Sequence, residues 1–170
     1  MAIDFTLSPE LEQLRLRVRD FVERVVKPGE AKIGNRDDIE RAEYVKILIH
    51  MRQEAQNAGL WLPHMPREWG GMGLGHVQLA MVQAEAAKSS YGPWVLNCQA
   101  PDEGNMHTLL HWATDAQKEK YLRPLCEGRV MSCFAMTEPE VAGSDPTLIQ
   151  TRAVRDGDDW VINGYKFFSS

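Results

Sequence analysis

The stretch EGRVMSCFAMTEPEVAGSD, residues 127–145, decides the fold because the periodicity of the chain changes inside it. Before it, apolar residues recur at three- and four-residue spacing, which is typical of helices. Residues 130–136 form instead a short apolar run that predicts a buried strand. This run meets Thr137-Glu138-Pro139 and then the small, polar Ala142-Gly143-Ser144-Asp145. Either a strand ends here in an ordinary loop, or it delivers hydroxyl and backbone N–H groups to a polar, anionic ligand.

Helix signals fill the part of the chain that precedes this stretch. Ser8-Pro9-Glu10 is a helix start, and Lys27-Pro28-Gly29 is expected to end that first helix. Asp37-Asp38 is expected to open a second helix, for which Gly59 is the natural stop. The residues of the second helix that we expect to face the interior are Val45, Leu48, Ile49 and Ala55.

Residues 60–75, LWLPHMPREWGGMGLG, read as a loop because two prolines and four glycines interrupt them. Their tryptophans and methionines make this loop too apolar for a solvated linker, so we expect it to pack over something. Further helices are predicted over residues 76–89, near residues 104–112, and from the capping box at Thr114 to the stop at Gly128.

After residue 129 the signals are those of strands. Residues 148–154 and 160–162 read as strands, and Asp156-Gly157 is a tight-turn signal between them. Helices first and strands afterwards predict a mainly α protein. We expect an N-terminal up-and-down helical bundle over residues 1–128, followed over residues 129–170 by the first strands of an antiparallel β domain.

Composition narrows the class of protein. Of 170 residues, 44% are hydrophobic and 25% charged, which is typical of a soluble globular protein. The net charge of −5 and the lack of a basic run argue against nucleic-acid binding. Cys98, Cys126 and Cys133 have no CxxC spacing and read as reduced core residues. Without a signal-peptide pattern or an apolar stretch of about 18 residues, we expect a cytoplasmic protein with no membrane span.

The histidines give no convincing metal motif. His107 and His111 lie four residues apart on an expected helix and could share one face toward a metal. No third ligand follows at a suitable spacing and HEXXH is absent, so we interpret them as ordinary helix histidines and expect no metal site.

Four ordered blocks resemble the acyl-CoA dehydrogenase family: PREWGGMGLG (66–75), DAQKEKYLRPLCEG (115–128), FAMTEPEVAGSD (134–145) and WVINGYKFFSS (160–170). Together they cover nearly the whole chain in the family's order and spacing. LNCQAPDEGNM, residues 96–106, further resembles the branch that includes kinase-fused members handling long or hydroxylated acyl chains.

The resemblance implies a flavoprotein. Members of the family bind FAD non-covalently between an N-terminal helical domain and a central β domain. A strand ending in T-E-P presents backbone N–H groups and a threonine hydroxyl to the pyrimidine edge of the flavin. These positions are Phe134, Ala135, Met136 and Thr137 here, and such hydrogen bonds stabilise negative charge on the reduced ring. The alternative for Thr137 is a strand-end hydroxyl bonded to local backbone.

The resemblance also places Gly143 and Ser144 near the pyrophosphate and the acyl-CoA substrate, which Ser144 would help to bind. Here one residue more than in the common P-G-A-G-S loop separates Pro139 from Ser144. Glu138 and Glu140 are rejected as catalytic bases, because the family takes its base from a C-terminal helical domain. We therefore expect no catalytic residue in these 170 residues.

In KFFSS, the resemblance assigns an aromatic to one flavin face and a hydroxyl near N5 two residues later. Phe168 and Ser170 stand at these positions, where many members have tryptophan and threonine. Phe167 is assigned to packing, since one of two adjacent aromatics must point into a core. The loop of residues 69–75 would lie beside the acyl chain and flavin, or else be a plain interhelical connection.

The implied reaction is oxidation of an acyl-CoA thioester to the trans-2-enoyl-CoA in fatty-acid oxidation, with electrons leaving through an electron-transfer flavoprotein. A homodimer or homotetramer is expected at full length. Two alternatives stay open: an oxidase or flavin monooxygenase of the same fold, and a non-catalytic helical binding module. The family is much longer than 170 residues, so we expect this chain to be a truncated piece that is inactive by itself.

Overall fold

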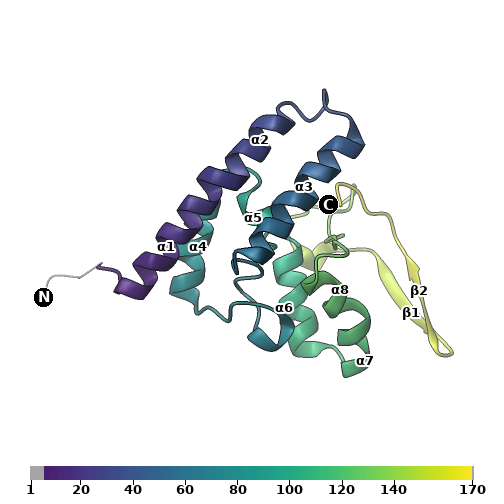
Figure 1. The fold of residues 1–170 in the computed structure, drawn as a ribbon. Helices are drawn as coiled ribbons and strands as arrows, with labels where there is room; N and C mark the ends of the chain where they lie inside the picture. The colour runs from purple at the N-terminus through teal and green to yellow at the C-terminus, as the bar shows by residue number, and fades with distance from the viewer. Residues whose placement is uncertain (1–5, 170) are drawn as a thin grey trace, which may run out of the picture. The chain divides into compact units, whose positions relative to one another are not determined.

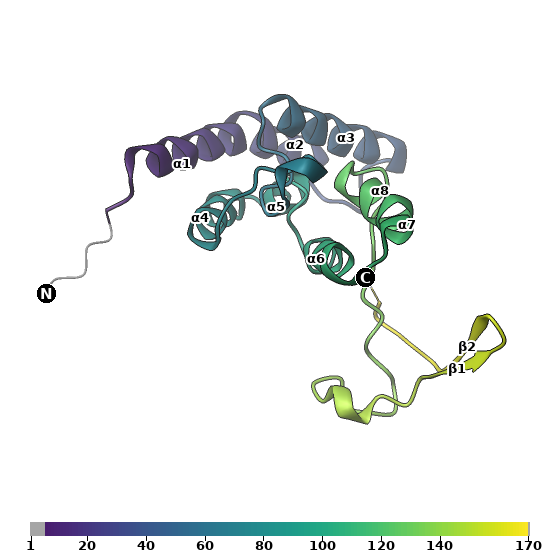
Figure 2. The same ribbon diagram turned by 90° about the horizontal axis from the view of Figure 1, so that it is seen from below.

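The computed structural model describes residues 6–169 and separates the chain into two units, Met1–Val130 and Met131–Ser170. The first unit is helical, and the second carries a two-stranded antiparallel sheet (Figures 1 and 2). The predicted fold class, a helical domain followed by the first antiparallel strands, is confirmed.

The first helix runs further than the sequence predicts. Helix α1 (Pro9–Phe21), a π-helical segment (Val22–Val26) and α2 (Lys27–Ile33) follow one another without interruption (Figure 1). The predicted end at residues 27–29 is therefore wrong. Pro28 lacks an N–H group and its ring would meet the carbonyl four residues earlier in a regular helix. The wider turn, in which the Lys27 N–H bonds to the carbonyl five residues before it, accommodates the proline.

The same wider, π-helical turn recurs before Pro124. The Arg123 N–H bonds to the Lys118 carbonyl, again five residues back, and the chain continues helically through the proline. The capping box between Thr114 and Gln117 is present as predicted. The elements are α7 (Asp115–Gln117), a π-helical segment (Lys118–Leu122) and α8 (Arg123–Cys126). Gly128 ends them with φ of 71°, as predicted.

Helix α3 (Arg41–Asn57) begins later than predicted. Asn35 and Asp38 instead form a turn of their own, in which the Asp38 N–H donates to the Asn35 carbonyl at 3.1 Å. The carboxylate of Glu40 caps the helix by accepting from two peptide N–H groups. Leu48 and Ala55 are buried as predicted, whereas Val45 and Ile49 are exposed. Gly59, with φ of 64°, ends this region as expected.

The loop of residues 60–75 packs into the core, as its composition predicts. Leu60, Leu62 and Met65 are almost fully buried. The loop folds on itself through hydrogen bonds, in which the Gly71 N–H donates to the Pro66 carbonyl and the Met72 N–H to the Leu62 carbonyl. One 3₁₀ turn, Arg67–Trp69, lies within it.

Three helices complete this unit: α4 (His76–Ala86), α5 (Gly92–Val95) and α6 (Asp102–Trp112). Helix α1 packs against α4, and α3 against α5 (Figure 2). Helix α5 was not predicted. A Cβ atom at Gly92 would lie 1.9 Å from the Ala86 carbonyl oxygen, so a close approach that only glycine permits sets this turn. Core side chains that are 0–1% exposed include Val18, Val22, Val26, Met51, Leu62, Met65, Val82, Val95, Leu96, Met106 and Leu122.

Glu85 and Arg52 are among the charged side chains buried in this helical core. Glu85 of α4 receives hydrogen bonds from Arg15 and Arg19 of α1 and from Lys88, which ties the two helices together. Arg52 of α3 lies over the rings of two tryptophans and donates to Asn97. Burial lowers the pKa of Arg52 to about 10, which leaves it charged near neutral pH.

In the second unit, β1 (Arg152–Asp156) pairs with β2 (Asp159–Asn163) through the predicted turn at Gly157, whose φ is 61°. The strand predicted over residues 130–136 is absent, because no other segment of residues 6–169 pairs with it. An apolar run needs a partner to become a strand. Phe134 is accordingly 60% exposed.

The cysteines divide in the same way. Cys98 and Cys126 are buried in the helical unit as predicted, whereas Cys133 is exposed because its run is not a buried strand. Among the helices of residues 6–169, none is both long and apolar enough to span a membrane.

Candidate functional site

The second unit brings two predicted site segments together. The Phe167 N–H donates to the Thr137 carbonyl oxygen at 3.2 Å, and the Lys166 ammonium donates to the Met136 carbonyl oxygen at 2.9 Å. Residues 166–168 are therefore held to residues 136–137, which places Phe168 one residue from a hydrogen bond to Thr137. These contacts join two segments that lie 30 residues apart in sequence.

Residues 134–137 form an edge whose peptide N–H groups are not used by the described part of the protein. The N–H groups of Phe134, Ala135, Met136 and Thr137 donate to no protein group within residues 6–169. In the same part of the chain, the Thr137 hydroxyl makes no hydrogen bond to local backbone. An extended segment with unpaired donors is able to bind an acceptor-rich ligand edge.

Glu138, next to this edge, is a buried carboxylate. Its oxygens accept from Lys166 Nζ at 2.9 Å, from the Gln150 N–H at 2.7 Å and from the Thr151 N–H at 2.9 Å. The hydrogen bond from the Lys166 ammonium, followed by those from Thr151 and Gln150, lowers the pKa of Glu138 to about 2. A carboxylate held in this way is a poor proton acceptor near neutral pH, which argues against its use as a base.

Gly143 lies beside Thr137, and Ser144 follows it in an exposed turn. A Cβ atom at Gly143 would be 3.6 Å from Thr137 Cγ2, which is an ordinary contact. The protein itself therefore has room for a side chain here. The turn is closed by the Asp145 N–H, which donates to the Ala142 carbonyl oxygen at 3.1 Å.

The two phenylalanines differ in exposure. Phe167 is half-buried, whereas Phe168 is 86% exposed, and their ring centroids lie 4.5 Å apart. Phe168 has φ of 52°, a left-handed conformation that costs a bulky residue about 1–2 kcal/mol. Ser170, assigned near the flavin N5 by resemblance, lies outside the described residues.

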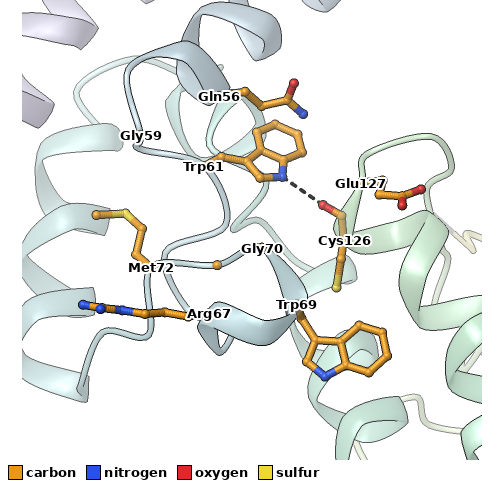
Figure 3. A pocket seen from close by; sticks show the side chains of 10 residues that line it. Gln56, Gly59, Trp61, Arg67, Trp69, Gly70, Met72, Cys126 and Glu127 are labelled. Carbon is orange, nitrogen blue, oxygen red and sulfur yellow. Dashed lines mark hydrogen bonds between the residues drawn. The ribbon is translucent and has the colours of Figure 1, made fainter.

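A separate cavity of about 610 Å³ opens in the helical unit (Figure 3). The ring of Trp61 forms one wall, with its Nε1 donating to the Cys126 carbonyl oxygen at 2.8 Å. Trp69 and Met72 contribute apolar side chains from the glycine-rich loop. The sequence pointed to the loop of residues 60–75, which supplies Trp61, Trp69 and Met72. It did not reveal the partners that come from the ends of α3 and α8: Gln56, Cys126 and Glu127.

The histidines of α6 have a third neighbour. His107 stacks on His111 at 6.3 Å between ring centroids, and His64 lies 5.3 Å from His107. His64 is 6% exposed, and neither of its ring nitrogens has a hydrogen-bond partner. Burial first, and His107 second, lower the pKa of His64 to about 4. Within residues 6–169 no group of three potential ligands could hold a metal ion.

The helical unit and the edge formed by residues 134–137 together define a two-domain class of protein, in which a helical domain precedes an antiparallel β domain. The chain belongs to the acyl-CoA dehydrogenase family. Residues 8–129 match the family's N-terminal domain and residues 133–170 match its middle domain.

Similar proteins carry the same assignment. Acyl-CoA dehydrogenase family member 11 of Gallus gallus is 39% identical over 173 residues, covering 98% of this chain and 22% of that protein. A solved Mycobacterium abscessus protein described as an acyl-CoA dehydrogenase is 36% identical with a TM-score of 0.85, covering 97% of this chain and 43% of that one. A glutaryl-coenzyme A dehydrogenase solved with glutaryl-CoA is 31% identical with a TM-score of 0.73, covering 98% of this chain and 40% of that one. This chain therefore spans less than half the length of these relatives.

Proposed function

We propose that this chain contributes an FAD-binding edge to an acyl-CoA dehydrogenase. The observation that carries the proposal is the row of unpaired peptide donors in residues 134–137, held next to the segment that carries Phe168. Membership of the family supports the cofactor class. Phe134, Ala135, Met136 and Thr137 would face the pyrimidine edge of the flavin, and Phe168 and Ser170 its ring face and N5.

These residues fit such a group chemically. The flavin pyrimidine edge offers acceptors, and residues 134–137 offer donors that nothing else in residues 6–169 uses. Phe168 presents an exposed ring, and Gly143 and Ser144 lie in a turn that is open to phosphate oxygens. When bound, the flavin supplies acceptance of a hydride from the acyl chain. The residues of this chain bind and orient it and stabilise negative charge at its edge.

The substrate would be an acyl-CoA thioester that is oxidised to the trans-2-enoyl-CoA in fatty-acid β-oxidation. Ser144 would contact this substrate. An electron-transfer flavoprotein would accept the electrons, and the full enzyme would be a homodimer or homotetramer. The family resemblance supports each of these points.

The base would come from outside these residues. Glu85 and Glu138 are buried carboxylates whose hydrogen bonds to cations lower the pKa of each to about 2. Glu103 accepts a hydrogen bond from the Gln83 amide at 3.1 Å. We expect no acyl-CoA-dependent dye reduction from the 170-residue polypeptide with added FAD, and substantial turnover would contradict this expectation.

The decisive experiment is titration of the full-length enzyme with FAD, followed by flavin fluorescence. Thr137→Val should weaken FAD binding by about tenfold, since one hydrogen bond to a charge-bearing ring is lost. Thr108→Val, which changes an exposed threonine of α6, should leave the affinity unaltered. Failure of the unaltered protein to bind FAD would refute the proposal and favour a non-catalytic helical module.

For the full-length enzyme, anaerobic addition of an acyl-CoA should bleach the flavin absorbance. Slow recovery of the colour in air is the result expected of a dehydrogenase. Rapid recovery in air would identify an oxidase of the same fold instead.

A further inference from the structure

We propose that Lys166 and Glu138 are positioning residues, which hold the edge formed by residues 134–137 in register with the segment that carries Phe168. The inference rests on the proposed FAD site. Neither side chain is assigned to the flavin itself, because both are engaged with protein groups. They act through the backbone that they hold.

Lys166 holds the edge from one side. Its Nζ donates to the Met136 carbonyl oxygen and to Glu138 Oε1, both at 2.9 Å. These two acceptors flank Thr137, whose own carbonyl accepts from the Phe167 N–H at 3.2 Å. Residues 136–138, the end of the edge and the residue after it, are thus held by Lys166 and Phe167, and Phe168 follows directly.

Glu138 holds the edge from the other side. Its side chain is 5% exposed, and it accepts from the Gln150 and Thr151 N–H groups as well as from Lys166. Residue 151 immediately precedes β1, so the carboxylate anchors the edge to the hairpin. A Cβ atom at Gly164 would lie 2.1 Å from Thr151 Oγ1, which shows that the chain after β2 passes close to the same point.

The asymmetry of these contacts separates positioning from simple charge attraction. Two peptide N–H groups require an acceptor at residue 138, and the Met136 carbonyl requires a donor from residue 166. Exchanging the two charges would keep the attraction between the side chains. It would, however, place an ammonium donor against the two N–H donors and a carboxylate acceptor against the Met136 carbonyl acceptor. By contrast, Lys27 and Glu23 form an exposed pair one helical turn apart that makes no such backbone contact.

The test compares FAD binding and the visible flavin spectrum of four variants of the full-length enzyme. Lys166→Met and the exchanged double variant Glu138→Lys with Lys166→Glu should each weaken FAD binding by about tenfold and shift the flavin absorption bands. Lys166→Arg retains a donor for both acceptors and should keep most of the affinity. Lys27→Met is the matched control, with affinity and bands unchanged.

A folding readout keeps the result interpretable. Helical circular dichroism should be the same in all four variants, and hydrogen exchange at the Gln150 and Thr151 peptide groups should be faster in Lys166→Met. An unchanged affinity and spectrum in Lys166→Met, or full recovery in the exchanged variant, would overturn the inference alone. Failure of the unaltered protein to bind FAD would overturn both this inference and the proposed function.

Discussion

The two units of the chain bury opposite kinds of side chain. In the helical unit the buried residues are mostly apolar, and buried charges such as Glu85 are enclosed by their partners. Among the described residues of the second unit, Glu138 is the buried side chain. Its apolar residues Trp160 and Ile162 are 63% and 71% exposed.

This difference indicates what holds each unit together. Fully burying a large apolar side chain stabilises a fold by about 1.5–3 kcal/mol, and the helical unit does this many times. A two-stranded hairpin has no such reserve and is marginal by itself. The second unit relies on a few polar contacts around Glu138, so the geometry of its candidate site depends on single hydrogen bonds.

The largest effect expected in the helical unit is that of Gly71→Ala. A Cβ atom at Gly71 would lie 2.1 Å from the Met65 carbonyl oxygen and 2.7 Å from that of Leu62, and neither backbone group can move freely. We expect a loss of about 4 kcal/mol in the free energy of unfolding, measured by denaturant titration.

Gly104→Ala is the control, because nothing lies within 4 Å of its Cβ position in α6. It should stabilise the protein by about 0.5–1 kcal/mol through helix propensity. Wild-type stability of Gly71→Ala would show that the glycine-rich loop is a loose connector and not a built wall of the cavity.

Acid should weaken the helical unit through His64. Burial depresses the pKa of this base from 6.5 to about 4, so the unfolded chain binds a proton more readily in that window. The stabilising contribution is complete above pH 6.5 and is lost as the pH falls toward 4, by about 3 kcal/mol in total.

His64→Leu removes the titrating group and should flatten stability between pH 6.5 and about 4, as measured by denaturant titration at each pH. His50→Gln, at an exposed position of α3, should leave the slope unchanged. An equal slope in His64→Leu and the unaltered protein would assign the acid sensitivity to other groups.

Arg52→Lys tests the buried charge of the helical core. The guanidinium donates to the Trp94 carbonyl and to Asn97 Oδ1 while lying over two tryptophan rings, which a lysine ammonium cannot reproduce. We expect a loss of about 2 kcal/mol in the free energy of unfolding. Arg41→Lys, exposed at the start of α3, should be neutral, and equal stability of the two variants would contradict the role assigned to Arg52.

The parts of the fold that sequence predicts well are those set by local chemistry. The capping box at Thr114, the glycine stops at Gly59 and Gly128 and the turn at Gly157 each depend on neighbouring residues, and all are present. The features of the fold that the sequence predicts wrongly depend on residues that are distant in sequence. Gly29 lies inside α2 and does not end a helix. A Cβ atom there would lie 2.2 Å from Met51 Sδ, so this glycine serves a contact with a distant residue.

The candidate site divides along the same line. The resemblance supplied residues 134–137 and Phe168, whose roles stay predictions. The contacts of Lys166 and Glu138 were missed, since a separation of 28 residues gives no periodic signal that would pair them. The run of residues 130–136 is apolar and suits a strand, yet it forms none. A strand requires a partner, and the propensity of a segment does not show whether a partner is present.

The smallest predicted effect makes the sharpest comparison between the two units. Val95→Thr and Val154→Thr are the same isosteric change at positions that are 0% and 60% exposed. Val95→Thr places a hydroxyl in the apolar core and should cost about 1–1.5 kcal/mol in the free energy of unfolding. Val154→Thr should stay within about 0.5 kcal/mol, because threonine suits a strand and water reaches the site. Denaturant titration of both variants measures the difference, and equal losses would mean that the hairpin is buried as deeply as the helical core.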